Sequence, residues 1–208
     1  MQALYHTQFR QYWQQFSAQI NLEYAQAEAL YLVLYSAYSE PQRHYHTVQH
    51  IVECLALLDH IKDELEDAVA VQVAIWFHDV VYDPKASDNE LQSAELMQKY
   101  CSHFLDQAQL EKVYAWILAT QQHQATLEPD LNAVLDIDLA ILGRDVKRFA
   151  EYQQQIQQEY AWVEPEIYQL KRAAVLQHFY SMQPLYQTEY FQHNFEHNAK
   201  ENLKAFLY

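Results

Sequence analysis

Glycine is almost absent from this chain. Gly143 is the only glycine in 208 residues, and there are five prolines, whereas ordinary chains contain about 7% glycine and about 5% proline. Hairpins, barrels and the glycine-rich turns that bind nucleotide phosphates all use backbone with positive φ, which glycine adopts most readily. The shortage excludes a Rossmann fingerprint and a P-loop, and it favours helices joined by short loops.

Basic residues are also scarce. The 13 lysines and arginines stand against 28 acidic residues, which gives a formal net charge of −15 at pH 7 with neutral histidines. Binding to nucleic acid depends on many contacts from Lys and Arg to phosphates, and anionic membrane surfaces attract the same cations. We therefore expect neither a nucleic-acid partner nor a membrane partner.

Long apolar runs and a cysteine framework are missing too. The longest nearly apolar stretch covers residues 68–77 and contains Gln72, so it is far shorter than the roughly 20 residues that span a bilayer. Cys54 and Cys101 are too few for a disulfide framework and are expected to be reduced thiols. The first residues, MQALYHTQFRQYW, lack the basic and then apolar build of a signal peptide. We expect a cytoplasmic protein.

Helical periodicity runs through the sequence instead. No linker rich in Ser, Gly or Pro interrupts it, and there is no internal repeat of about 20 to 50 residues. The pattern predicts an all-α fold, with one domain over residues 1–208 and a bundle of about ten helices. We expect these helices at 4–18, 22–38, 47–60, 67–79, 88–103, 108–123, 129–142, 145–161, 164–182 and 188–206.

Local signals mark several of the helix ends. Pro41 ends the second helix, and Asp83 with Pro84 closes the fourth. The run 87–90 (Ser-Asp-Asn-Glu) fits a capping box that opens the fifth helix. Gly143 stands where a C′ glycine would end the seventh.

One helix differs from the others because it is apolar nearly all round. The run from Ala68 to Phe77 has the pattern of a helix buried in the middle of a fold, and it ends in His78 and Asp79. Burying an imidazole beside a carboxylate is costly unless something pairs with them. A metal ion is such a partner, because neutral His and ionised Asp are both good ligands.

Other candidate ligands stand on two further predicted helices. His46 and His50 are four residues apart, so both project from one helix face. Asp136 and Asp138 lie within a second apolar run, 133–142. As with Asp79, burying two carboxylates there is costly unless something pairs with them. Along the chain, the candidate metal ligands therefore come in the order His, His-Asp, Asp, and three separate predicted helices carry them.

This order on an all-α chain resembles the HD superfamily of metal-dependent phosphohydrolases. The segments RHYHTVQHI (43–51), WFHDVVYDP (76–84), DNELQSAEL (88–96) and LDIDLAILG (135–143) are similar to a bacterial group of HD-type hydrolases, and EYAWV (159–163) and ENLKAF (201–206) extend the likeness over nearly the whole chain. The resemblance implies an HD-type helical domain. It does not specify a substrate, because the superfamily includes phosphomonoesterases, nucleotidases, cyclic-nucleotide phosphodiesterases and a few oxygenases.

The resemblance also implies one divalent ion (Mn, Fe, Co, Ni, Zn or Mg) with four ligands, which are His50, His78, Asp79 and Asp138. His50 is preferred to His46 because the arrangement from Tyr45 to His50 is similar to cyclic-nucleotide phosphodiesterases, in which the first His donates a proton and the second binds metal. Asp138 is preferred to Asp136 because Asp-Leu matches the final Asp of the superfamily, and Asp136 lies about 200° round the helix from it.

The implied reaction is hydrolysis of a small phosphate ester such as a nucleotide. The metal activates water and holds a phosphoryl oxygen, and Asp79 also orients the attacking water. His46, or else His123, protonates the leaving oxygen. Developing charge needs cationic neighbours, for which the candidates are Arg43, Lys171 and Arg172.

Several assignments keep an alternative. Glu90 is a candidate substrate contact, as is Ser93 one turn on, although a capping box needs a Glu at that place regardless of function. A dinuclear iron oxygenase of HD type would need two more histidines, for which His103 and His123 are available. A non-catalytic HD domain is the third possibility. The Tyr- and Phe-bearing outer helices also make a homodimer possible.

Overall fold

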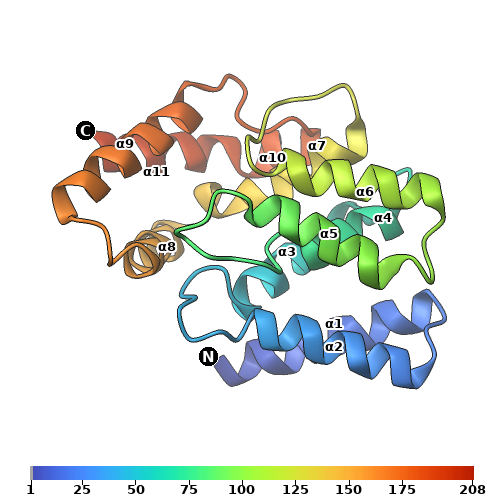
Figure 1. Ribbon diagram of the computed structural model, residues 1–208. Coiled ribbons are helices and arrows are strands. Elements are labelled where there is room, and N and C mark those ends of the chain that lie inside the picture. The colour runs from blue at the N-terminus through green and yellow to red at the C-terminus, as the bar shows by residue number, and fades with distance from the viewer. Residues whose placement is uncertain (1) are drawn as a thin grey trace. The chain divides into compact units, whose positions relative to one another are not determined.

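The computed structural model describes residues 2–208, and all regular secondary structure in that range is helical (Figure 1). There are eleven α-helices and two short 3₁₀ helices in it, so the predicted all-α class is confirmed. The chain divides into two compact units, Met1–Gln124 and Ala125–Tyr208, which are described separately below. A single functional domain over residues 1–208 stays a prediction. None of the described helices is both long and apolar enough to cross a membrane.

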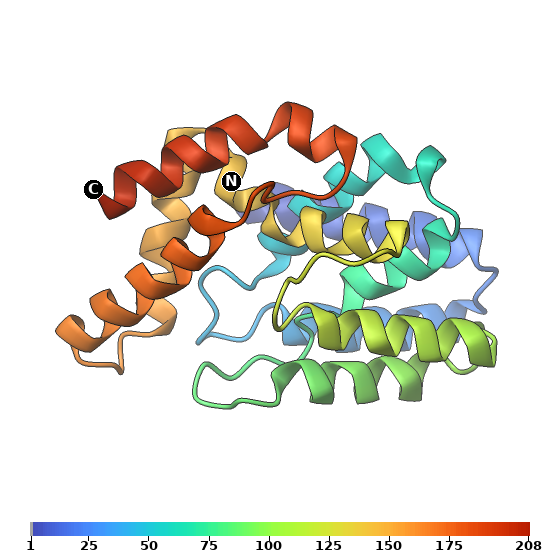
Figure 2. The same ribbon diagram turned by 90° about the horizontal axis from the view of Figure 1, so that it is seen from above.

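The first unit is built around α4, the helix with the apolar sequence. From Ala70 to Phe77 all but Gln72 are buried, and α4 packs against α3, α5 and α6, of which α5 and α6 lie side by side (Figure 2). Trp76 meets the rings of Phe9 and Trp13 edge-on, which ties α4 to α1. The elements are α1 (Gln2–Gln19), α2 (Tyr24–Ala37), α3 (Val48–Ile61), η1 (Lys62–Glu64), α4 (Ala68–Phe77), α5 (Asn89–Cys101) and α6 (Gln107–Ala119).

The second unit places the other apolar run, α7 with the 3₁₀ turn η2, in its core. Nearly all residues from Asp130 to Gly143 are buried, and η2 is covered by α8 and α11. The elements are α7 (Pro129–Leu139), η2 (Ala140–Gly143), α8 (Val146–Glu159), α9 (Pro165–Ser181), α10 (Glu189–Asn194) and α11 (Glu196–Leu207).

The last predicted helix, 188–206, is wrong as a single element. The chain leaves helical geometry at Phe195, whose φ is −126°, and this residue separates α10 from α11. The break lets both carboxylate oxygens of Glu196 accept hydrogen bonds from the backbone N–H of Leu185, while the N–H of Tyr186 donates to one of them. These tertiary bonds have no local signal in the sequence.

The predictions for two helix ends are also wrong. No capping box forms at 87–90: Asp88 is the N-cap of α5 but its side chain makes no capping bond. The side chain of Asn89 instead pairs with the backbone of Asp83 in both directions, at 2.9 Å each, so the loop folds back on the helix start. Gly143 does not have a positive φ, so it is not a C′ glycine in the left-handed conformation.

Gly143 is needed because another backbone lies against it. A Cβ atom built there would lie 2.7 Å from the carbonyl oxygen of Phe195 and 2.8 Å from its Cβ, and backbone cannot move aside as a side chain can. We expect Gly143→Ala to lower the free energy of unfolding by about 1–3 kcal/mol, the usual cost of overpacking. Chemical denaturation measures this, with the exposed substitution Ala150→Ser on α8 as the control. A gain of about 0.4–1 kcal/mol, typical of Gly→Ala at an unstrained site, would contradict the close contact.

Candidate metal centre

The first candidate ligand, His50, lies in the first turn of α3. Its side chain is 2% exposed, so the imidazole is almost completely shielded from solvent. Cys54, one turn further along, has its Sγ atom 3.7 Å from Nδ1 of His50. The thiol therefore packs against the side of the ring, and Nε2 points toward the end of α4.

The second candidate ligand, His78, is oriented by the helix that it ends. Its Nδ1 lies 3.0 Å from the carbonyl oxygen of Ile75, one turn back in α4. Because a carbonyl oxygen can only accept, Nδ1 carries the proton of that bond. In the neutral ring Nε2 is then an acceptor, and metal-binding histidines are commonly oriented in this way.

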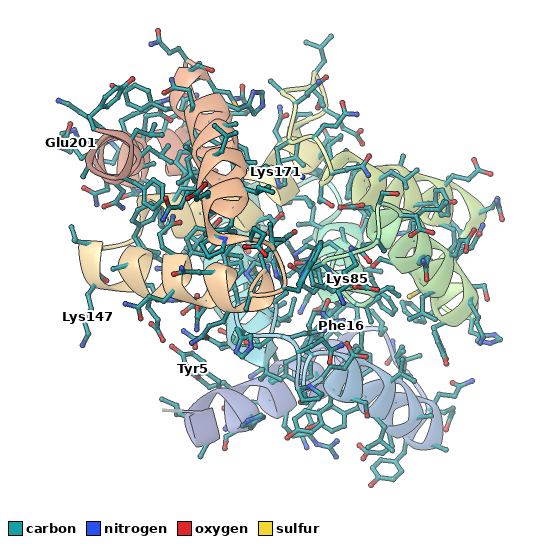
Figure 3. All side chains as sticks on the ribbon, turned by 60° about the vertical axis from the view of Figure 1, so that its left-hand side comes forward. Tyr5, Phe16, Lys85, Lys147, Lys171 and Glu201 are labelled. Atoms are coloured by element: carbon teal, nitrogen blue, oxygen red, sulfur yellow. The ribbon has the colours of Figure 1, made fainter. Side chains whose placement is uncertain are left out.

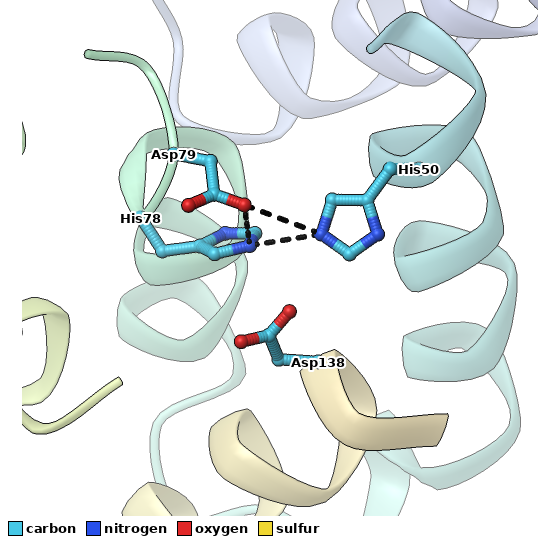
Figure 4. Close-up of side chains that lie close together, drawn as sticks. All are labelled: His50, His78, Asp79 and Asp138. Atoms are coloured by element: carbon cyan, nitrogen blue, oxygen red, sulfur yellow. Dashed lines mark hydrogen bonds and ion pairs between the residues drawn. The ribbon is translucent and has the colours of Figure 1, made fainter. Parts of the chain in front are cut away.

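The ligand atoms of His50, His78 and Asp79 converge on one point (Figure 4). The two Nε2 atoms are 3.1 Å apart, and Oδ2 of Asp79 lies 3.1 Å from Nε2 of His78 and 3.5 Å from Nε2 of His50. With metal–ligand bonds of about 2.1 Å, neighbouring ligand atoms are about 3.0 Å apart in an octahedron and about 3.4 Å in a tetrahedron. The three separations match neighbouring ligand positions around one metal ion.

The electrostatics of this group favour a cation. Burial raises the pKa of Asp79, but the imidazoles of His78 and His46 and hydrogen bonds from His50 and His78 outweigh it and hold that pKa well below its usual range. The protons that form these hydrogen bonds occupy the place of a cation: with both Nε2 atoms unprotonated, their lone pairs and the ionised carboxylate lie 3.1–3.5 Å apart, and a shared metal ion relieves the repulsion. The chemistry of the donor set, two imidazole nitrogens and a carboxylate oxygen, fits a divalent transition metal.

His46 lies beside these ligands and outside their group. Its half-buried ring stacks on Tyr82, with centroids 4.0 Å apart and planes 29° apart, and Tyr45 meets it edge-on. The centroid of His46 is 6.0 Å from that of His50. The imidazole is therefore fixed next to the converging ligands, and its role as a proton donor stays a prediction. Tyr82 was not predicted to hold it, because no pattern in the loop after His78 and Asp79 signals a stacking partner.

In the second unit, Asp136 and Asp138 stand in different surroundings. Asp136 is buried and accepts hydrogen bonds from the backbone N–H of Gln187 and from the N–H and hydroxyl of Thr188, at 2.8–3.0 Å. Burial raises its pKa to about 6, although these hydrogen bonds act to lower it. Asp138, two residues on, is half-buried at the end of α7. Asp136 thus faces away from Asp138 and anchors a loop, as the helical geometry predicted.

The remaining candidates lie on other elements of the two units. His123 follows α6 with a positive φ of 50° and is half-buried. Glu90 accepts a hydrogen bond from Gln121 at 3.2 Å, and His103 is exposed just after α5. On α9 of the second unit, Lys171 is exposed (Figure 3). Arg172 is buried beside Lys171, where its Nε donates to Gln153 and its guanidinium lies 4.9 Å above the ring of Tyr152.

Comparison with known proteins found no relative of this chain. No family model, no curated protein and no solved structure matches the chain. The function must therefore be argued from the side chains themselves.

Proposed function

We propose that this protein is a metal-dependent phosphohydrolase of the HD type, which hydrolyses a small phosphate ester with one divalent ion bound by His50, His78, Asp79 and Asp138. The observation that carries the proposal is the convergence of three ligand atoms at 3.1–3.5 Å at the end of a buried helix. Asp138 is proposed as the fourth ligand because it is a half-buried carboxylate in an otherwise apolar run, and because the resemblance to HD proteins selects it.

The ligand set leaves positions for substrate and water. Three or four protein ligands do not fill an octahedral shell, and an open position is what separates catalytic from structural metal sites. When bound, the metal supplies an activated water and polarises a phosphoryl oxygen. Asp79 has a second carboxylate oxygen besides Oδ2, which can orient that water. We assign the proton for the leaving oxygen to His46, and the stacking of its ring on Tyr82 supports this role by fixing the imidazole.

Elemental analysis of the purified protein, paired with a phosphatase screen, tests the proposal. We expect about one divalent transition metal per chain and hydrolysis of some nucleotides or sugar phosphates. Chelation should abolish most of the activity, because the activated water is lost with the metal, and added Mn, Ni or Mg should restore it. A protein that binds no metal even when it is supplied would overturn the proposal. Two irons per chain would favour the HD-type oxygenase instead.

The role of His46 makes a separate prediction. We expect His46→Gln to lower kcat by about 100-fold, the typical contribution of a general acid, while the metal content stays unchanged because the ring is not a ligand. Steady-state kinetics over a range of pH measures this, and the variant should also lose the limb of the pH profile at which the acid deprotonates. His44→Gln, two residues away on an exposed side chain, is the control. An unchanged kcat in His46→Gln would show that another group protonates the leaving oxygen.

A further inference from the structure

Arg43 is the most deeply buried cation of the first unit. It lies in the segment between α2 and α3, and its side chain is 1% exposed. The guanidinium is placed between the rings of Tyr38 and Tyr82, 5.3 and 5.5 Å from their centroids. An arginine buried this fully is unusual unless its donors are all satisfied within the protein.

All three nitrogens of this guanidinium donate to the protein. Nη1 donates to the carbonyl oxygen of Asp79 at 2.6 Å and reaches that of His46 at 3.3 Å. Nη2 donates to the carbonyl oxygen of Val80 at 2.9 Å, and Nε to the carboxylate of Glu40 at 2.9 Å. Two neighbouring carbonyl groups are thus held by one planar fork, a geometry that lysine cannot reproduce.

The next residue of the same turn is held from the other side. Ser93 on α5 accepts a hydrogen bond from the backbone N–H of Val81 at 3.0 Å and donates to its carbonyl oxygen at 3.3 Å. Ser93 is fully buried. The turn that follows α4 is therefore fixed between Arg43 and Ser93, and Asp79 is its first residue beyond His78.

From these contacts we infer that Arg43 is a positioning residue for the metal ligands, and that it does not bind the phosphate of the substrate. The inference rests on the proposed metal site. The peptide that Arg43 holds belongs to Asp79, so it fixes the direction in which the carboxylate leaves the backbone. The same guanidinium also donates to the carbonyl oxygen of His46. It therefore links this turn to the segment that leads into α3, the helix that carries His50. Three of its four hydrogen bonds go to backbone carbonyls and the fourth goes to the carboxylate of Glu40, so a phosphoryl oxygen that engaged these donors would have to displace them.

Co²⁺ binding tests this role without any substrate. The visible absorption bands of bound Co²⁺ report both affinity and ligand geometry, and they are followed in the wild type, Arg43→Ala, Arg43→Lys and Arg10→Ala. Arg10 is the matched control, because it also pairs with a glutamate in the first unit but lies 30% exposed on α1. We expect both Arg43 variants to bind Co²⁺ about 10- to 100-fold more weakly, the usual effect of losing a group that orients a ligand. Arg10→Ala should bind like the wild type.

Chemical rescue separates positioning from general stability. A low, non-denaturing concentration of guanidinium chloride should restore Co²⁺ affinity and the wild-type spectrum to Arg43→Ala, whereas the same concentration of NaCl should not. If Arg43→Ala loses its helical circular dichroism, Arg43→Lys, which keeps the buried charge, carries the comparison. Wild-type affinity and spectrum in the folded Arg43 variants would overturn the inference and leave the metal site standing. A wild type that binds no Co²⁺ would overturn both.

Discussion

Replacing Asp79 by asparagine is expected to remove the proposed metal and the proposed phosphatase activity together. The amide keeps the size of the carboxylate but has no negative charge, and it can turn an N–H₂ group toward the two Nε2 atoms that now lie about 3 Å from Oδ2. We expect metal affinity to fall at least about 100-fold, and kcat/KM at least about 1000-fold, which corresponds to about 4 kcal/mol of transition-state stabilisation. Elemental analysis and steady-state kinetics measure the two effects.

A thermal measurement separates metal loss from misfolding in this variant. A ligand that binds only the folded state stabilises it by about 2.7 kcal/mol at 100 times its Kd, so added metal should raise the Tm of the wild type but not that of Asp79→Asn. Without metal the variant should melt no higher than the wild type, because it loses the ionised carboxylate that the imidazoles of His78, His46 and His50 stabilise. Asp88→Asn is the control, because it removes the same charge from an exposed carboxylate that caps nothing. A metal-dependent rise in the Tm of Asp79→Asn would show that this carboxylate is not a ligand.

Part of the site was predictable from the sequence because burying a polar or charged side chain without a partner costs free energy. An apolar helix that ends in His78 and Asp79 must bury those groups, and the structure confirms that His78 is buried and that Asp79 converges with His50. The different faces of Asp136 and Asp138 were predictable for a similar reason. Two residues along an α-helix correspond to a turn of about 200°, whatever packs against it.

The rest depended on contacts between distant residues. Arg43 was predicted to contact the substrate because it adjoins the histidines in sequence, yet two of its nitrogens donate to backbone carbonyls 36 and 37 residues further on. That pairing follows from how α3 and α4 pack, which no local pattern encodes. The closeness of Gly143 to Phe195 is of the same kind, and so is the division between α10 and α11. At position 143, glycine is required by a close backbone contact and not by a turn.

The second large effect is expected from a matched pair on α7. Asp138→Ala should lose the metal and the activity, because we propose this carboxylate as the fourth ligand. The metal-free stability of Asp138→Ala should change less than that of Asp136→Ala, because Asp138 is half-buried whereas Asp136 is buried, and alanine is a better helix former than aspartate. Elemental analysis, kinetics and denaturation of the chelated protein measure the three quantities. Substituting both acids in turn makes the same chemical change two residues apart on one helix.

Asp136→Ala should show the opposite pattern. It leaves the backbone N–H of Gln187 and of Thr188 and the Thr188 hydroxyl without their acceptor in a part-buried place, and a donor that water does not reach costs about 1–3 kcal/mol when unsatisfied. We expect a net loss of about 3 kcal/mol in the free energy of unfolding, with metal content unchanged in the folded protein. If Asp136→Ala loses the metal and Asp138→Ala keeps it, the ligand assignment is reversed. If neither loses it, the second unit contributes no ligand, and His50, His78 and Asp79 bind the ion alone.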